Sequence, residues 1–343
     1  MSLPTIPSRV VLAPMAGGPG TPGLVAAVSN AGGLGFLPSG YLSAERLAQD
    51  LVTLRALTAC SFGVNLFVPA GPDPGRLADA EAYAKRVAVW SRLSGLPMAG
   101  PVYTDDEFQA KVDLLLREPP AVVSFAFGLP EQPIVEAFRQ ANVAVMITVT
   151  TPQEAALAER AGADALVVQG AEAGAHQGGW LPVRGDPIGL LALLQLVTDA
   201  TTLPVLAAGG IATGGGIAAV LALGAEAAML GTAFLRCNEA GTSPAHAIAL
   251  GEAVSGTTLT RAFTGRSARA IRNDFVEALD QYAPEAYPEV HMATAPLRVE
   301  ARRRGDAQRM HLWAGQAFRL ARELPAARLV DELVNETRCA RAR

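Results

Sequence analysis

Short apolar runs alternate with longer amphipathic segments between Val10 and Leu235. Within a run, apolar and polar residues do not alternate, which is typical of strands buried on both faces of a parallel sheet. The segments between the runs have the length of helices, for example Ser43–Leu57, Asp105–Arg117, Pro130–Gln140, Pro152–Ala161 and Gly215–Leu223. The predicted strands are Val10–Ala13, Leu34–Leu37, Phe62–Leu66, Val122–Phe125, Val143–Val149, Ala165–Gln169, Val205–Ala208 and Ala227–Leu230.

Residues at the segment ends support these assignments. Ser43 precedes its segment as a typical N-cap residue. Thr151 stands before Pro152, which places proline in the first turn of the helix, where its missing N–H costs nothing. Gly162 and Gly224 each follow a predicted helix and precede the next strand by a few residues, as expected of glycine C-caps.

The regular alternation predicts a parallel sheet covered by helices. Eight strands would close a (β/α)8 barrel; an open, doubly wound sheet is the alternative, and Met98–Tyr103 could add a ninth strand. Glycine and polar residues follow the strands, for example Gly17, Asn65, Gly209 and Gly231. In a barrel all these positions lie on the C-terminal rim, where barrel enzymes build their active sites. We therefore predict the barrel.

The alternation stops at about Arg236. Beyond it, Ser243–Val254, Phe318–Leu324 and Arg328–Glu336 are predicted helices. The predicted organisation is a barrel over residues 1–237 and a helical C-terminal appendage over residues 238–343 that closes over the barrel rim.

Composition excludes several classes of protein. The 343 residues carry a net charge of -4 and no basic run longer than Arg302–Arg304, so nothing indicates a nucleic-acid partner. Cys60, Cys237 and Cys339 lie far apart and suggest neither a metal site nor a disulfide framework, so we expect a cytoplasmic protein without a bound metal. We find no signal peptide, and interrupted apolar runs argue against a membrane span. The sequence leaves the oligomeric state open, with a homodimer as one option.

The stretch after the sixth predicted strand holds the strongest candidate for catalysis. Gln169 ends the strand, and a loop rich in glycine and alanine follows with His176. Small neighbours let a ligand approach the backbone, and imidazole titrates near neutral pH. Taken by itself, the stretch would favour an ordinary surface histidine. For the other histidines we expect His246 at the surface or in a helix cap, and His291 and His311 in core packing.

Two glycine-rich strand ends predict an anion site. Ala207–Ile211 (AAGGI) and Met229–Thr232 (MLGT) close the seventh and eighth strands, and the next helix begins at Thr213 with three glycines. Backbone N–H groups at such turns and at helix N-termini bind anions, and barrels often hold a phosphate at this location. Ordinary tight turns also need glycine, but the pairing at two adjacent strands favours phosphate.

Two amides and one small-residue turn are further candidates. The buried amide of Asn65 needs partners, either on a flavin or nucleobase edge or on the backbone of a neighbouring strand. The same argument applies to Gln169. The turn Ala13–Gly17 has little bulk and could lie against a flat aromatic ligand.

Seven motifs occur in order along Val10–Leu235: APMAG, NAGGLGFL, FGVNLF, VSFAFGLP, QGAEAGAHQGG, AAGGI and MLGTAFL. As a set they resemble the nitronate monooxygenases, formerly called 2-nitropropane dioxygenases. That family consists of TIM barrels that bind FMN without a Rossmann fold. The resemblance implies oxidation of alkyl nitronates by FMN and O2, through a flavin semiquinone, to a carbonyl compound and nitrite. A histidine can stabilise the anionic nitronate or take the α-proton of a nitroalkane.

The resemblance also implies residue roles. His176 would be the catalytic residue facing the flavin, and Tyr103 would line the substrate pocket. Two departures from the family stand out. Ala175 replaces a common glycine, which would strain the loop if φ is positive there, and lysine is absent after Lys111, so the substrate pocket must differ from that of the best-studied class. The residues that would bind FMN are Pro14, Met15, Ala16, Asn65, Gln169, Gly174, Gly209, Gly210, Met229, Leu230, Gly231 and Thr232.

The nearest rival functions use the same barrel. Enoyl-acyl-carrier-protein reductases and quinone reductases would need NAD(P)H to reduce the flavin, and no nucleotide-binding motif points to them. The motif VSFAFGLP favours the oxygenase. A flavin barrel that has lost turnover is a third hypothesis.

Overall fold

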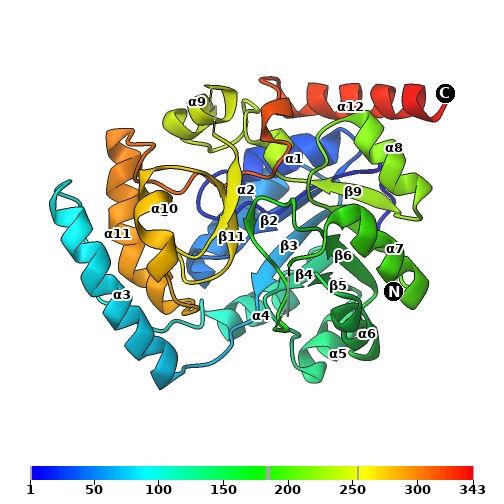
Figure 1. Cartoon of the computed structure of the whole chain (residues 1–343). Helices are drawn as coiled ribbons and strands as arrows, with labels where there is room; N and C mark the ends of the chain where they lie inside the picture. Colours follow the sequence, from blue (N-terminus) through cyan, green and yellow to red (C-terminus); the bar gives the residue numbers. More distant parts are fainter. Residues whose placement is uncertain (1, 183–185, 253–254, 343) are drawn as a thin grey trace.

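The computed structural model describes residues 2–182, 186–252 and 255–342. Eight parallel strands form a closed barrel in the order β1-β2-β3-β4-β5-β6-β8-β9 (Figure 1). The pairing of β1 with β9, with Val11 opposite Met229, closes the sheet. The barrel prediction is confirmed. The barrel strands are β1 (Val10–Leu12), β2 (Leu34–Pro38), β3 (Phe62–Phe67), β4 (Val122–Ala126), β5 (Ala144–Val149), β6 (Ala165–Gln169), β8 (Val205–Ala208) and β9 (Ala227–Leu230).

The outer ring of helices is completed by the end of the chain. After β9 the chain builds the appendage and then returns to the barrel, where α12 packs against α8 and α1 and touches β1 (Figure 1). The last helix therefore belongs with the barrel ring rather than with the appendage. The ring helices are α1 (Pro22–Asn30), α2 (Ala44–Leu57), α4 (Phe108–Arg117), α5 (Gln132–Gln140), α6 (Pro152–Arg160), α7 (Leu190–Ala200), α8 (Gly214–Ala222) and α12 (Ala326–Arg341).

Two layers of apolar side chains hold the barrel, because successive residues of a strand face opposite sides. Val11, Phe36 and Met146 fill the interior, whereas Leu12 and Val64 pack between the strands and the helices. The interior is tightly filled: a Cβ on Gly63 of β3 would lie 2.3 Å from the Phe36 ring.

The predicted helix caps are present. The Ser43 hydroxyl accepts from the Arg46 N–H at 3.1 Å, and the Thr151 hydroxyl accepts from the Glu154 N–H at 3.1 Å. Gly162 and Gly224 have φ of +87° and +93°, the left-handed conformation of a glycine that ends a helix.

The ninth strand that the sequence left open does not form, and one predicted helix is wrong. Met98–Tyr103 is not a strand, because the closed barrel leaves no edge to pair with; Ala99 instead donates its N–H to Ala293 of the appendage. Phe318–Leu324 forms only the 3-10 turn η3 (Phe318–Leu320), since Pro325 disfavours a helical conformation for Leu324.

The appendage is mainly helical, as predicted, but it also contains a small antiparallel sheet in the order β10-β11-β7. Its strands are β10 (Thr257–Thr260) and β11 (Ala268–Ile271), joined by β7 (Ala175–His176) from the barrel loop. The predicted helix Ser243–Val254 is α9 (Pro244–Glu252), and Val254 lies outside the described residues. The other helices of the appendage are α10 (Asp274–Leu279) and α11 (Glu289–Arg304). The helix α3 (Pro74–Arg92) belongs to the connection between β3 and β4 and packs against α11. None of these three helices was predicted from the sequence.

The described helices show no candidate for crossing a membrane, since none is both long and apolar enough. The short 3-10 turns η1 (Thr232–Phe234) and η2 (Asp280–Tyr282) complete the described elements.

Candidate active site

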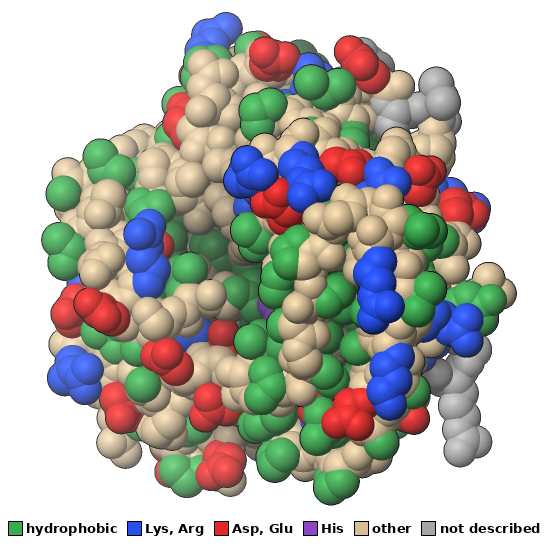
Figure 2. Space-filling model, turned by 90° about the vertical axis from the view of Figure 1, so that its left-hand side faces the viewer, with side chains coloured by type: hydrophobic (Ala, Val, Ile, Leu, Met, Phe, Trp, Pro, Cys, Tyr) green, Lys and Arg blue, Asp and Glu red, His purple; other side chains and the backbone are tan. Residues whose placement is uncertain are grey.

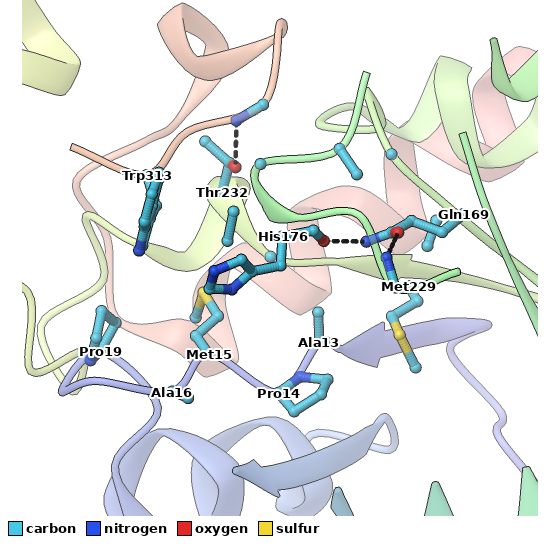
Figure 3. Close-up of a pocket in the computed structure, with 18 of the residues that line it drawn as sticks. Ala13, Pro14, Met15, Ala16, Pro19, Gln169, His176, Met229, Thr232 and Trp313 are labelled. Atoms are coloured by element: carbon cyan, nitrogen blue, oxygen red, sulfur yellow. Dashed lines mark hydrogen bonds between the residues drawn. The ribbon is translucent and has the colours of Figure 1, made fainter. Parts of the chain in front are cut away.

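A cavity that opens to solvent lies at the C-terminal ends of the barrel strands. The molecule has a hollow on the side that carries α3 and α11, with hydrophobic side chains and a histidine inside it (Figure 2). In Figure 3 the His176 ring projects into the cavity that Met15, Thr232 and Trp313 also line. The cavity brings together twelve predicted site residues: Pro14, Met15, Ala16, Asn65, Gln169, Gly174, His176, Gly209, Gly210, Met229, Gly231 and Thr232.

Two predicted residues lie elsewhere. Leu230 is only 1% exposed and packs between the strands and the helices, because it follows Met229, which faces the barrel interior. Its side chain does not line the cavity, and its role in cofactor binding stays a prediction. Tyr103 lines a second cavity, which shares Tyr41 and Phe127 with the first. Its role as a substrate residue stays a prediction.

The His176 ring is held by the appendage. His176 pairs with Ala268 of β11, and its Nε2 lies 2.9 Å from the Thr264 hydroxyl. The aromatic rings of Phe127, Tyr287 and Trp313 surround the imidazole at centroid distances of 5.5, 5.7 and 5.5 Å. The ring is therefore fixed in an aromatic enclosure that opens to the cavity.

The electrostatic surroundings keep His176 neutral. Burial, as the largest cause, and the nearby guanidinium groups of Arg266 and Arg298 together lower its pKa to about 3. Within the described residues, neither arginine has a carboxylate within the 4.0 Å of an ion pair. Buried charges are usually paired, so two unpaired cations beside a cavity indicate a site for an anion.

Gln169 positions the histidine loop. Its Nε2 donates to the His176 carbonyl at 3.2 Å, and its Oε1 accepts from the Gly178 N–H at 2.7 Å (Figure 3). From the other side, Arg266 donates to the carbonyls of Gln177 and Gly179. The loop is thus clamped between the barrel and the appendage.

The NH2 end of the Asn65 amide bonds to a neighbouring strand, which was one of the two partners predicted for it. Its Nδ2 donates to the carbonyl and the hydroxyl of Ser124 on the neighbouring strand β4, at 3.2 and 3.0 Å. Its Oδ1 accepts no hydrogen bond from the residues that the structure describes, so one acceptor remains on this cavity-lining side chain.

The backbone before His176 is strained, as the missing glycine would suggest. Ala175 has φ of +61°, which an L-residue adopts at a cost of roughly 1–2 kcal/mol. Gly174 cannot carry a side chain, since a Cβ there would lie 2.5 Å from the backbone nitrogen of Gly315 in the appendage. Close packing against the appendage therefore holds the loop in this conformation.

The two parts of the predicted anion site differ in whether they face the cavity. Gly209 and Gly210, with φ of +109° and +70°, line the cavity together with Gly231 and Thr232. The N-terminus of α8 is different, because its Gly214 N–H donates to the Glu336 carboxylate of α12 at 2.7 Å. The chain's own carboxylate thus occupies the helix end that the sequence suggested for phosphate.

The three remaining histidines all line a cavity. His246 is 6% exposed and thus not at the surface, but it does lie in the first turn of α9, where its N–H donates to the Ser243 hydroxyl at 3.4 Å. Its Nε2 lies 3.1 Å from the Trp313 carbonyl. His311 lines the first cavity, and its buried Nδ1 has no partner among the described residues. His291 is buried, as predicted, but it also lines the second cavity, where its ring stacks on Tyr41.

Sequence reasoning missed Thr264, Arg266, Arg298 and Tyr287. They stand in segments after the barrel where no periodicity marks a buried face. The one available signal was arginine inside apolar stretches, since buried arginine usually serves a partner. Among the described residues, no group of three or more His, Cys, Asp or Glu could hold a metal ion.

A closed (β/α)8 barrel with a buried histidine, paired glycine turns and unpaired cations at its C-terminal face defines a barrel enzyme that acts on a bound small molecule. The Nitronate monooxygenase family model matches residues 4–336, and the chain belongs to that family. It is 43% identical to the nitronate monooxygenase of Pseudomonas aeruginosa, covering 97% of each chain. It is 36% identical to the probable nitronate monooxygenase of Staphylococcus saprophyticus, covering 95% of this chain and 94% of the relative.

Two solved structures are similar to this chain over nearly its whole length. The nitroalkane oxidase of Streptomyces ansochromogenes is 48% identical and superposes with a TM-score of 0.95 over 98% of both chains. FabK of Thermotoga maritima is more distant, at 28% identity and a TM-score of 0.75 over 97% of this chain and 94% of its own.

Proposed function

We propose that this enzyme binds FMN at the C-terminal face of the barrel and uses it to oxidise alkyl nitronates with O2, giving a carbonyl compound and nitrite. Family membership supports the reaction class, and the family is generally flavin-dependent. The observation that carries the proposal is the neutral His176 in this cavity, with the cations Arg266 and Arg298 close to the imidazole in the two adjoining cavities. A nitronate is an anion that such a site attracts.

The cavity fits FMN in three respects. The turns at Gly209–Gly210 and Gly231 present backbone without side chains, as a phosphate requires. The turn Pro14–Ala16 offers a low surface against which a flat ring system can lie. The free Oδ1 of Asn65 can accept from a ring N–H. Thus Gly209, Gly210, Gly231 and Thr232 would hold the phosphate end, and Pro14–Ala16 with Asn65 the ring.

When bound, FMN would supply the redox chemistry that links the nitronate to O2. Overall, two nitronates and one O2 yield two carbonyl compounds and two nitrite ions, which balances atoms and charge. The chain's residues bind, orient and shield the reactants. The positive field of Arg266 and Arg298 stabilises the anion, and the rings of Phe127 and Trp313 exclude water beside His176.

Gly210→Ala is expected to weaken FMN binding about tenfold, because a left-handed alanine costs roughly 1–2 kcal/mol. The added Cβ would also lie 3.1 Å from the Glu172 Cβ and displace the turn. The measurement is an FMN titration of the apoprotein by flavin fluorescence.

The matched control is Gly215→Ala, where the added Cβ would find only the Thr213 hydroxyl at 3.7 Å on an exposed helix. We expect unchanged FMN affinity there. Equal affinities for both variants and the wild-type protein would remove the Gly210 turn from the cofactor site.

The proposed function is tested with the purified protein. We expect a yellow protein that releases FMN on denaturation, takes up oxygen rapidly with propionate 3-nitronate and forms nitrite. Colourless protein that cannot be reconstituted with FMN would refute the cofactor. Activity with NADH or NADPH and none with nitronate would place the enzyme with the reductases, to which the likeness to FabK points.

A further inference from the structure

The Thr264 hydroxyl, in the turn between β10 and β11, has a complete set of hydrogen-bond partners. Its Oγ1 lies 2.9 Å from His176 Nε2, donates to the Arg266 carbonyl at 3.2 Å and accepts from the Arg266 N–H at 3.4 Å. Thr264 is 1% exposed, so no water competes for these positions. A hydroxyl has one hydrogen and two acceptor lone pairs, which fixes what each contact can be.

The Arg266 carbonyl can only accept, so a hydroxyl that donates its single hydrogen to this carbonyl accepts from the imidazole. His176 Nε2 must then carry a hydrogen. In the neutral ring the other nitrogen, Nδ1, has none. Nδ1 makes no hydrogen bond with the described residues and is not among their buried unpartnered atoms, so it is open to the cavity.

We propose that Thr264 is a positioning residue that sets the tautomer of His176, so that a bare Nδ1 faces the substrate as a base. The proposal rests on the proposed function for the identity of that substrate. Nδ1 takes the α-proton of a neutral nitroalkane, and the C–H electron pair becomes the C=N bond of the nitronate. The imidazolium that forms is balanced by the new anion.

The opposite tautomer of His176 would change which substrates the enzyme can use. With hydrogen on Nδ1, the ring could only donate to a nitronate that is already ionised, and the Arg266 carbonyl would lose its donor because Thr264 would turn toward Nε2. The position of one hydrogen therefore decides whether neutral nitroalkanes are substrates.

The kinetic test compares Thr264→Val with Thr264→Ser in the FMN-loaded enzyme, using nitroethane and ethyl nitronate. Valine has the shape of threonine but cannot accept from Nε2, whereas serine keeps the hydroxyl. For Thr264→Val we expect kcat/KM to fall on the order of 10²-fold with nitroethane and less than about threefold with ethyl nitronate. For Thr264→Ser we expect wild-type values with both. Equal losses with both substrates, together with lost FMN or a lower Tm, would show a merely structural role and overturn the proposal.

A spectroscopic test needs no turnover. The chain has 4 histidines, so long-range 1H–15N spectra of the 15N-histidine holoenzyme are simple, and His176→Asn identifies the signals of His176. We expect hydrogen on Nε2 alone in the wild type and a mixture of tautomers in Thr264→Val. Hydrogen on Nδ1 in the wild type, or an unchanged tautomer in the variant, would overturn the proposal. This spectrum does not depend on activity. An enzyme that shows no turnover of nitronate would therefore refute the proposed function but would leave the proposal on the His176 tautomer intact.

Discussion

His176→Asn is expected to lower kcat with nitroethane by about 10²- to 10⁴-fold, the usual contribution of a positioned general base. Asparagine fits the same space and can still hydrogen-bond to Thr264, but it cannot take a proton at neutral pH. With preformed ethyl nitronate the loss is smaller, about tenfold, because only orientation and a hydrogen bond are removed. FMN binding is expected to persist, since the proposed phosphate turns at Gly210 and Gly231 are untouched.

The measurement is steady-state oxygen uptake with both substrates, normalised to bound FMN. The FMN content and the Tm of the variant serve as controls for the fold. Unchanged kinetics with nitroethane in a variant that binds FMN normally would remove His176 from the mechanism.

The second large effect is a loss of stability in mild acid. Burial lowers the pKa of His176 to about 3 and that of His246 to about 4, and it lowers the pKa values of His291 and His311 well below their usual value. In the unfolded chain all four titrate near about 6.5. Below that pH the unfolded state binds more protons, so stability present above about pH 6.5 is lost as the pH falls toward about 4.

The size of this loss in the free energy of unfolding follows from the number of histidines with a lowered pKa. Each depressed histidine removes about 1.4 kcal/mol per pH unit in this window, so four together remove about 5 kcal/mol per unit. Typical domains have about 5–15 kcal/mol in total, and we therefore expect the apoprotein to unfold between about pH 3.5 and 5.5. Urea unfolding at a series of pH values measures the slope. His246→Gln is expected to reduce the slope by about a quarter, and a free energy of unfolding that stays constant from pH 7.5 to 5 would contradict the account.

Much of the barrel could be predicted because its signals are local. An uninterrupted apolar run such as Val205–Ala208 is a buried strand wherever it packs, and Ser43 or Gly162 ends a helix through bonds to its own neighbours. The strand ends could also be predicted as a site, because closing the sheet places Asn65, Gln169 and their counterparts on one rim.

The appendage side could not be predicted, because its contacts join residues far apart in the chain. Thr264 lies beside His176 only once β11 pairs with β7, and nothing in its own segment indicates this. Likewise, Glu336 reaches the N-terminus of α8 only when α12 docks on the barrel, so a glycine-rich helix start suggested an anion site that the chain itself fills. Local sequence patterns therefore predicted where the site lies, but not which distant side chains pack into it.

The most direct test of the central claim is the absorbance of the bound flavin under anaerobic conditions, after mixing the FMN-loaded enzyme with ethyl nitronate, NADH or NADPH in turn. The account predicts that only the nitronate changes the flavin spectrum and that O2 restores it with release of nitrite. Bleaching by NADH or NADPH with no response to the nitronate would contradict the account and assign this barrel to flavin reductase chemistry.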